Sequence, residues 1–408
     1  MSDVMKGFRI LEVAEHTFVP AASAILAEWG ADVVKVEHVT RGDAMRGLGS
    51  TGVMDLSKGV HVLYEHSNRG KRSIGLDLTV PEGLSVLYDI AKTADVFLSN
   101  KTLDIARKLK IGVEDIRAHN SKIIYARGSA YGTRGPEGES GGYDMTGFWC
   151  RGGSSASCTP PNIGGVISQP GPAYGDSMGA MTIAGGIAGA LLKRERTGEP
   201  SVVDVSLLGL GTWVMGAGMA LSMQMGQAWQ HPPIGGPGLG FGNPLVGVFL
   251  TRDERYLNLT MLQAFKYWPD FCKHIDREDL VTDPRFDSHE NLTANAAEAS
   301  EILREIFATK TLAEWRAKFA TLKGQWAPIQ NVLELAEDPQ VRANGYVASA
   351  ETAGGTPFEL AASPVQFDEK PTPTRRGPEF NEHGDEILQE LGLDWDEIIA
   401  LKTKGAVA

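Results

Sequence analysis

Short apolar runs and longer amphipathic stretches alternate through the first third of the chain. The amphipathic stretches at residues 21–29 and 81–93 predict helices, and Pro81 suits the first turn of the second. The apolar runs are of strand length, and they predict five β-strands, at residues 9–14, 33–37, 73–78, 95–99 and 123–126. Strands that alternate with helices indicate a parallel sheet with right-handed crossovers.

The pattern changes after this region. Residues 132–175 are rich in Gly, Ser and Pro and lack helical periodicity, so we expect one long loop of the kind that often carries function. A helix is expected over residues 177–196 and an apolar helix over residues 203–225. Residues 246–250 and 256–260 predict a β-hairpin. Later helical stretches are expected at residues 263–275, 297–308, 312–319 and 382–391.

Two uncharged apolar stretches raise the question of a membrane span. Residues 179–192 are too few to cross a bilayer. Residues 205–225 are numerous enough, but they include polar side chains such as Ser206 and Gln224 and have no basic flank. We therefore interpret both stretches as buried helices and expect no membrane partner.

Composition and charge narrow the class of protein. The chain has 408 residues, 42% hydrophobic and 22% charged, which is usual for a globular protein of two lobes. The net charge of −12 argues against a nucleic-acid partner, because phosphate backbones require a broad basic surface. Cys150, Cys158 and Cys272 offer neither a disulfide framework nor a metal site. With no secretory signal in the first residues, we expect a cytoplasmic protein with reduced thiols.

The usual nucleotide and hydrolase motifs lack their structural context. Gly47, Gly49 and Gly52 fit G-x-G-x-x-G, but no predicted strand leads into them. G-x-S-x-G occurs around Ser140 and around Ser177, and again no predicted strand precedes the serine. We therefore expect neither a dinucleotide site nor a serine hydrolase.

Asp176 is the most informative residue, since it follows Gly175 at a predicted helix start after the long loop. Two interpretations stay open from the residues alone: an N-cap that accepts backbone hydrogen bonds, or a carboxylate nucleophile. The basic cluster at residues 68–73 and a second one around Lys101 and Lys108 are likewise either solvated surface or a clamp for phosphate groups.

An ordered series of segments resembles the class III CoA-transferase family, also called the CaiB/BaiF family. This family includes formyl-CoA transferase, carnitine CoA-transferase and, as a sister branch, α-methylacyl-CoA racemase. The resemblance spans nearly the whole chain. Its matching segments are residues 10–12 with Pro20, 29–37, 41–46, 68–78, 94–100, Gly175 with Asp176, 196–198, 204–207, 338–341 and 382–388.

The resemblance implies an α/β fold with a Rossmann-like large domain built from both chain ends, a smaller α+β domain and an interlocked-ring homodimer. On this basis we assign residues 1–200 to the N-terminal part of the large CoA-binding domain and residues 201–228 to a linker helix. Residues 229–326 would form the small α+β domain, and residues 327–408 the return linker and the C-terminal part of the large domain.

The resemblance also implies an activity, the transfer of CoA from an acyl-CoA to a carboxylic acid. Asp176 would be the nucleophile and would carry an aspartyl-CoA thioester, with Tyr143 and Asp144 beside it and Gly236 and Gly238 in a covering glycine loop. CoA is then a substrate, and neither a metal nor a permanently bound cofactor is expected. The expected CoA contacts are His16, Thr17, His38, Lys71, Arg72, Asn100, Lys101 and Lys108.

A racemase is the principal alternative, and a non-catalytic acyl-CoA-binding homologue is another. The racemase branch has a histidine before the aspartate of a Gly-His-Asp segment, where this chain has Gly142, Tyr143 and Asp144. Proton transfer at one carbon needs two acid/base groups, and tyrosine, with an ordinary pKa of about 10, is a weak acid. Tyr143 therefore favours the transferase. The family's Ala-Gly-Pro near the first helix is Phe18, Val19 and Pro20 here, which leaves the detailed CoA contacts open.

Overall fold

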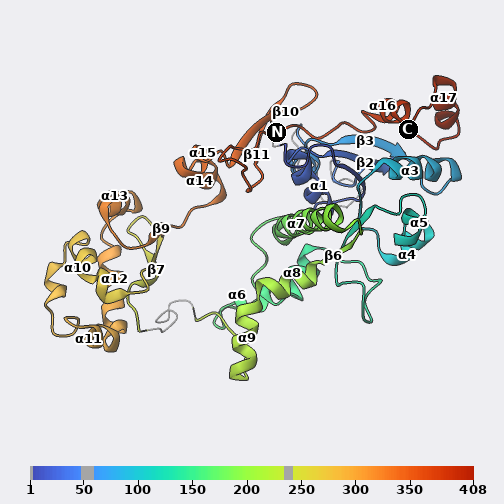
Figure 1. Cartoon of the computed structure of the whole chain (residues 1–408). Coiled ribbons are helices and arrows are strands. Elements are labelled where there is room, and N and C mark those ends of the chain that lie inside the picture. Colours follow the sequence, from blue (N-terminus) through green and yellow to red (C-terminus); the bar gives the residue numbers. More distant parts are fainter. Residues whose placement is uncertain (1–2, 47–58, 234–241) are drawn as a thin grey trace. The chain divides into compact units, whose positions relative to one another are not determined.

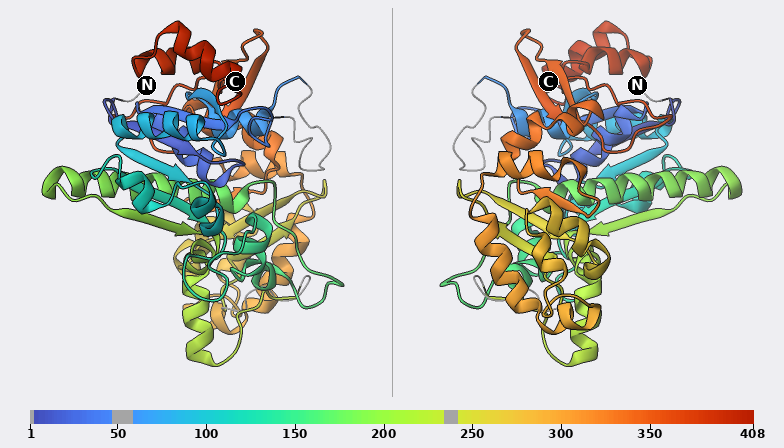
Figure 2. Two further views of the ribbon diagram at one scale, coloured as in Figure 1. Left: turned by 90° about the vertical axis from the view of Figure 1, so that its right-hand side faces the viewer. Right: turned by 90° about the vertical axis from the view of Figure 1, so that its left-hand side faces the viewer.

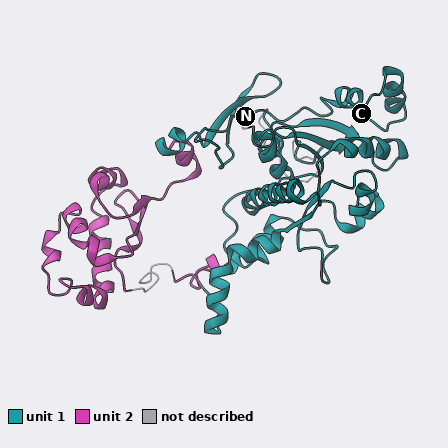
Figure 3. Cartoon of the chain, viewed as in Figure 1, with its two compact units in different colours: residues 1–156, 167–229, 339–408 teal, residues 157–166, 230–338 magenta. Residues whose placement is uncertain are grey.

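The structure is a computed structural model, and it describes residues 3–46, 59–233 and 242–408. Two compact units divide the chain (Figure 3). The first unit contains both ends of the chain. The units consist of residues 1–156, 167–229 and 339–408, and of residues 157–166 and 230–338.

A six-stranded sheet forms the centre of the first unit (Figure 1). All neighbouring strands are parallel, and the strand order is β3-β2-β1-β4-β5-β6. This is the order of a Rossmann-like sheet, and it confirms the predicted parallel α/β architecture. The strands are β1 (Arg9–Val13), β2 (Asp32–His38), β3 (Arg72–Leu76), β4 (Val96–Ser99), β5 (Ile124–Ser129) and β6 (Val202–Ser206).

The edge strand β6 corrects one expectation. We predicted a single helix over residues 203–225, but Val202–Ser206 pairs with β5 in parallel register. The apolar stretch is long enough for a helix, yet its start alternates Val203, Asp204 and Val205, which is the period of a strand. The helical part begins only at Leu207.

Helices cover both faces of the sheet because neighbouring strand residues point to opposite sides. Ile10 of β1 lies in the core formed with α1 (Phe18–Glu28) and α7 (Tyr174–Thr197). Leu11 lies in the core on the other face, formed with α3 (Pro81–Thr93). The last part of the chain, drawn in red in Figures 1 and 2, packs against this second face through α16 (Gly384–Glu390) and α17 (Trp395–Thr403).

Several shorter elements of the first unit were not expected. Part of the predicted loop over residues 132–175 is helical, since a π-helix covers Met145–Cys150 and α6 covers Ser154–Cys158. Helix α7 begins at Tyr174, a little before the predicted start. The other additional elements are α2 (Val62–Asn68), α4 (Leu103–Lys108), α5 (Val113–Arg117), α15 (Pro339–Ala343), β10 (Val347–Glu351) and β11 (Pro357–Ala361).

The apolar stretch after β6 is buried only in part, at Leu207, Leu210 and Gly211, and not throughout as we expected. It forms α8 (Leu207–Val214) and α9 (Gly216–Met225), and no residue of α9 is buried. Trp213, at the end of α8, is 84% exposed. No helix within the described residues combines the length and the apolar character needed to cross a bilayer.

The second unit has its own sheet and core. The predicted hairpin is confirmed as β7 (Val246–Leu250) and β8 (Tyr256–Thr260), and β9 (Trp326–Pro328) pairs antiparallel to β8. Residues 327–338, which we assigned to the return linker, group with this unit. Trp268 and Trp315 are central in its core. Its helices are α10 (Ala264–His274), α11 (His289–Ala294), α12 (Ala296–Phe307), α13 (Leu312–Lys318) and α14 (Val332–Glu337), with single turns at Glu278–Val281 and Phe319–Thr321.

Candidate active site

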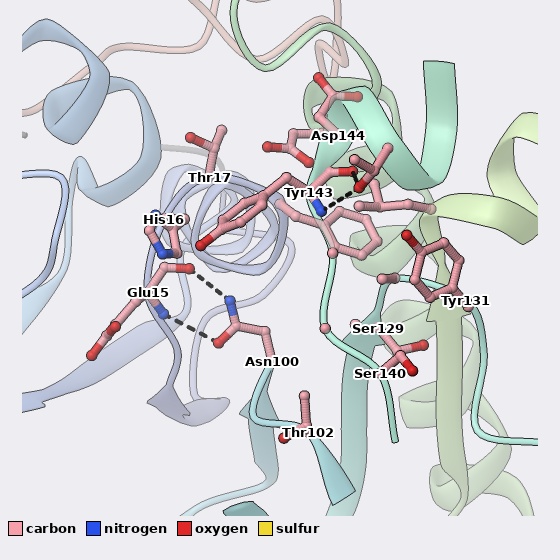
Figure 4. A pocket seen from close by; sticks show the side chains of 18 of the residues that line it. Glu15, His16, Thr17, Asn100, Thr102, Ser129, Tyr131, Ser140, Tyr143 and Asp144 are labelled. Atoms are coloured by element: carbon pink, nitrogen blue, oxygen red, sulfur yellow. Dashed lines mark hydrogen bonds between the residues drawn. The ribbon is translucent and has the colours of Figure 1, made fainter. Parts of the chain in front are cut away.

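Two cavities open where the strand order of the first unit reverses. Strand β1 lies between β2 and β4, so the connections after β1 and β4 leave a crevice at the carboxyl ends of the strands. The larger cavity has a volume of about 790 Å³ and is lined from β1, β4, β5 and the start of α7 (Figure 4). The smaller, of about 260 Å³, lies at the ends of β1, β2 and β3. Glu15, Lys101 and Ile105 line both, so the cavities adjoin.

Asp176 lies in the first turn of α7 and lines the larger cavity. The residue before the helix, Ala173, has a φ of 57°, in the left-handed region that is unfavourable for alanine. A side chain at Gly175 would overlap the ring of Phe148 and the carboxylate of Asp144. Only glycine therefore allows the start of α7 to approach the segment that carries Asp144.

Asp144 is buried, with 6% of its surface exposed, and its carboxylate lies against the start of α7. The backbone N–H of Gly175 donates to both of its oxygens, at 3.1 Å each. Burial raises the pKa of Asp144, while hydrogen bonds from the backbone of residues 174–176 and from the side chain of Gln169 oppose that rise. Asp144 thus takes the capping role that the sequence left open for Asp176.

Asp176 is the most strongly perturbed carboxyl group of the larger cavity. Burial and the neighbouring carboxylate of Asp144 raise the pKa of Asp176 to about 7. Part of its population is therefore ionised near neutral pH, and the ionised form is poorly solvated. A desolvated carboxylate aimed into a cavity can attack an electrophilic carbonyl carbon.

Tyr143 and His16 meet at the mouth of the larger cavity. Their rings are edge to face, with centroids 5.6 Å apart, and Tyr143 is 66% exposed. His16 adopts a φ of 69°, and its backbone N–H donates to Asp43 at 3.3 Å. Thr17, the N-cap of α1, lines the same cavity. The structure thus brings His16, Thr17, Tyr143, Asp144 and Asp176 together, as drawn in part in Figure 4.

The loops after β1 and β4 are joined by a pair of hydrogen bonds. Asn100 Nδ2 donates to the carbonyl of Glu15 at 2.7 Å, and its Oδ1 accepts from the Glu15 N–H at 3.3 Å (Figure 4). Lys101 follows Asn100 and lines both cavities, while His38, at the end of β2, lines the smaller one. These residues share one crevice, as expected for contacts to a single elongated ligand.

Lys71, Arg72 and Lys108 line neither cavity. The Lys71 amine is buried and donates to Glu12 at 2.6 Å, to the Pro20 carbonyl and to Asn68, so all three of its N–H groups are occupied. Arg72 stands at the amino end of β3, whereas the smaller cavity lies at the carboxyl end of this strand.

Arg72 and Lys108 form ion pairs with carboxylates that line neither cavity. Arg72 binds Asp32 and Glu390 at 2.7 Å each. Lys108 is exposed and lies 3.4 Å from Asp104, one helical turn away. We leave all three cations out of the proposed site.

Two glycines that we expected in the site lie outside the described residues. Gly236 and Gly238 fall in the segment 234–241, which the structure does not describe. Among the described residues, no group of three or more His, Cys, Asp or Glu side chains is arranged to hold a metal ion.

Several residues of the crevice were not predicted from the sequence. Glu15 and Arg41 form an ion pair of 2.8 Å at the smaller cavity, and Gln169 bonds Asp144 from within the long loop. Arg127, within β5, lines the larger cavity but is paired with Asp204 at 2.8 Å. The only signal for Glu15 and Arg41 was their place directly after β1 and β2, where ligands of such sheets bind.

Comparisons with known proteins identify the family of the chain. A family model described as CoA-transferase family III matches residues 5–384. (R)-2-hydroxy-4-methylpentanoate CoA-transferase of Clostridioides difficile is 26% identical over 410 residues, which are 99% of each chain. Alpha-methylacyl-CoA racemase of Mus musculus is 28% identical over 404 residues, 98% of this chain and 96% of the relative. The crystal structure of a CAIB/BAIF family protein from Brucella suis matches with a TM-score of 0.78 and 25% identity, covering 96% of this chain and 100% of that one.

Proposed function

The chain belongs to CoA-transferase family III, and we propose that it moves coenzyme A from an acyl-CoA thioester to a carboxylic acid. The observation that carries the proposal is Asp176, a carboxyl group with a pKa raised to about 7 that lines a cavity of about 790 Å³. Because the family relatives catalyse different reactions, the donor, the acceptor and the covalent intermediate are part of the proposal.

The reaction proceeds by exchange at Asp176. A carboxylate oxygen of Asp176 attacks the thioester carbonyl, the C–S bond breaks, and CoA leaves as the thiolate, so that a mixed anhydride remains. The thiolate then attacks the Asp176 carbonyl, the donor acid leaves as its carboxylate, and an aspartyl-CoA thioester forms. The acceptor carboxylate then attacks the aspartyl-CoA thioester and releases the CoA thiolate, so that a second mixed anhydride forms. The thiolate attacks the acceptor carbonyl of this anhydride, the new CoA thioester leaves, and the Asp176 carboxylate is regenerated. Each step exchanges one carboxylate or thiolate for another, so no net proton or electron is needed.

The two adjoining cavities suit the two ends of CoA. We place the thiol end and the acyl group in the larger cavity, near Asp176 and Tyr143, and the nucleotide end in the smaller one. Lys101 lies where the two cavities meet, and His38 lies at the end of β2 beside the smaller cavity. Gly236 and Gly238 are proposed as backbone donors for the oxyanions that form during the exchange.

Trapping the covalent intermediate tests this function. The protein is incubated with an acyl-CoA and treated with hydroxylamine or borohydride, and the peptide that carries Asp176 is analysed by mass spectrometry. A hydroxamate or a reduced side chain at Asp176 supports the transferase. An unmodified Asp176 under conditions of measurable transfer contradicts the mechanism. A screen of acids, with 2-hydroxy acids first because of the Clostridioides difficile relative, identifies the acceptor.

A racemase is the second candidate, since the mouse relative bears that name. Such a reaction needs a second acid/base group opposite Asp176, and Tyr143 stands where that branch has histidine. Incorporation of solvent deuterium at the α-carbon distinguishes the two reactions.

We also propose that the protein is a cytoplasmic homodimer. In the single chain, Trp213 is 84% exposed and Met223 71% exposed, which is unusual for side chains of this size. Cys150 and Cys158 are exposed free thiols, as suits a reducing compartment. Sedimentation equilibrium tests the dimer, and a monomeric mass at micromolar concentration contradicts it. Cell fractionation tests the location.

A further inference from the structure

One carboxylate holds the two cations that are available at the junction of the cavities. Glu15 Oε1 lies 2.8 Å from Arg41 Nη2 and 3.4 Å from Lys101 Nζ. Burial acts to raise the pKa of Glu15, but Lys101 and Arg41 outweigh it and hold this pKa below its ordinary value. Glu15 is therefore charged whenever the protein is near neutral pH.

The other charged groups that line the smaller cavity have partners elsewhere. Glu37 binds the Arg46 guanidinium at 2.7 Å. Asp77 accepts hydrogen bonds from the backbone and the hydroxyl of Thr79. Of the cations around the larger cavity, Arg127 is paired with Asp204. Arg41 and Lys101 thus have Glu15 as their shared anionic partner among the described residues that line the crevice.

The position of Glu15 is fixed by its backbone rather than by its side chain. Asn100 bonds both the N–H and the carbonyl of Glu15, as Figure 4 shows, so the loops after β1 and β4 stay together whatever the side chain does. Neither of these hydrogen bonds involves the Glu15 side chain, so they do not depend on its ion pairs with the two cations. Arg41, 48% exposed, is also able to turn toward a ligand.

We propose that Glu15 is an anionic latch: it occupies Arg41 and Lys101 in the empty protein, and a diphosphate group of the CoA nucleotide displaces it from them. The inference rests on the proposed function, because it takes CoA as the ligand. A diphosphate offers more oxygens and more charge than one carboxylate. It therefore binds both cations in place of Glu15, and the Glu15 side chain turns to solvent. The latch lowers CoA affinity, which suits an enzyme that must release a CoA product in every cycle.

Calorimetric titration with CoA tests the latch. Glu15→Gln removes the charge but keeps the size, so we expect CoA to bind about three- to tenfold more tightly than to the wild type. The affinity for pantetheine, which lacks the nucleotide phosphates, should not change. Arg41→Ala should weaken CoA binding, and in the Arg41→Ala background the gain from Glu15→Gln should shrink, because the two side chains then no longer interact.

Asp77→Asn is the matched control, since it removes one negative charge from the same cavity without freeing a cation. An equal gain from Asp77→Asn would overturn the latch and leave general electrostatics as the cause. Unchanged or weaker CoA binding by Glu15→Gln also overturns it. If circular dichroism shows that Glu15→Gln is unfolded, Glu15→Asp serves instead, because its shorter side chain loses the reach to Arg41, and tighter CoA binding is again expected.

The outcomes separate the latch from the function on which it rests. If the wild type binds CoA and neither Glu15 variant binds it more tightly, the latch is wrong and the proposed function stands. If neither the wild type nor the variants bind CoA, both are overturned.

Discussion

The backbone N–H of Gly175 donates to both carboxylate oxygens of Asp144, at 3.1 Å each. This contact joins the long loop to the start of α7 and places two carboxyl groups, Asp144 and Asp176, at one helix end. Asp144 takes up the helix N-terminus, and Asp176 is left to face the cavity. A capping residue and a candidate nucleophile are thus adjacent but distinct.

Gly175→Ala should reduce activity sharply, because the added methyl group overlaps Phe148 and Asp144 and pushes the first turn of α7 away. A shift of this kind costs about 10²-fold in kcat/KM when it moves a reacting group by about 1 Å. Gly185→Ala in the same helix is the control, since nothing lies within 4 Å of the added carbon apart from its chain neighbours and the backbone of its own helix. That control should keep its activity and gain about 0.5–1 kcal/mol in stability. Equal activity in the two variants would show that the close approach at Gly175 is not needed.

The pH profile of kcat/KM should have an acidic limb near pH 7. Asp176 attacks as the carboxylate, and burial together with Asp144 raises its pKa to about 7, so activity is lost as pH falls through that value. Asp144→Asn removes the neighbouring charge and should move the limb to lower pH. Initial rates between pH 5 and pH 9 measure both profiles. A limb that stays in place in Asp144→Asn would contradict the coupling of the two carboxyl groups.

Asp176→Asn should abolish transfer and should also change how stability depends on pH. The pKa of Asp176 is higher in the folded protein than its ordinary value of 3.8. Its contribution to stability is therefore complete below about pH 4 and is lost as pH rises toward 7. The uncharged variant escapes this loss, so it should exceed the wild type by about 1–4 kcal/mol at pH 8 and by less at pH 5.

Urea unfolding at pH 5 and pH 8 tests the stability difference, and CoA binding by the folded variant tests whether the site is intact. Substantial transfer by Asp176→Asn would remove Asp176 as the nucleophile. A variant that is less stable than the wild type at both pH values would mean that the Asp176 carboxylate supports the fold.

The sequence predicted those parts of the fold that depend on local pattern. The apolar runs located the first five strands, and the hairpin of β7 and β8 was predicted to the residue. The pattern failed in the stretch from β6 to α9, where a long apolar run was taken for one buried helix. Pairing with β5 decides that Val202–Ser206 is a strand, and this long-range contact outweighs the apolar content that suggested one continuous helix.

The site was predictable only where chain position and residue type agree. Asn100 and Lys101 directly follow β4, and Asp176 lies in the first turn of α7, so the ends of these two elements bring all three to the crevice. Lys71 and Lys101 look alike in sequence, and packing separates them: Lys71 meets Glu12, 59 residues earlier, beneath α1. No short-range pattern reveals that contact. From the sequence, the lysine of the basic cluster at residues 68–73 was therefore expected to contact CoA, whereas its buried amine lines neither cavity.

The identity of Tyr143 bears on the class of reaction. Wild-type protein incubated with a 2-methylacyl-CoA in D₂O should show no loss of the α-proton signal by NMR, because Tyr143 is too weak an acid to act opposite Asp176. Tyr143→His supplies an imidazole, yet it should not create efficient exchange by itself. The Tyr143 side chain is 66% exposed and packs edge to face on His16. An imidazole at position 143 would therefore lie at the exposed rim of the cavity. Both bases must lie within hydrogen-bond reach of one carbon, a geometry that one substitution at the rim does not supply. Tyr143→Phe is the control, and transfer by this variant measures what the hydroxyl contributes. Exchange by the wild type at an ordinary enzymatic rate would replace the transferase with the racemase as the activity of this site.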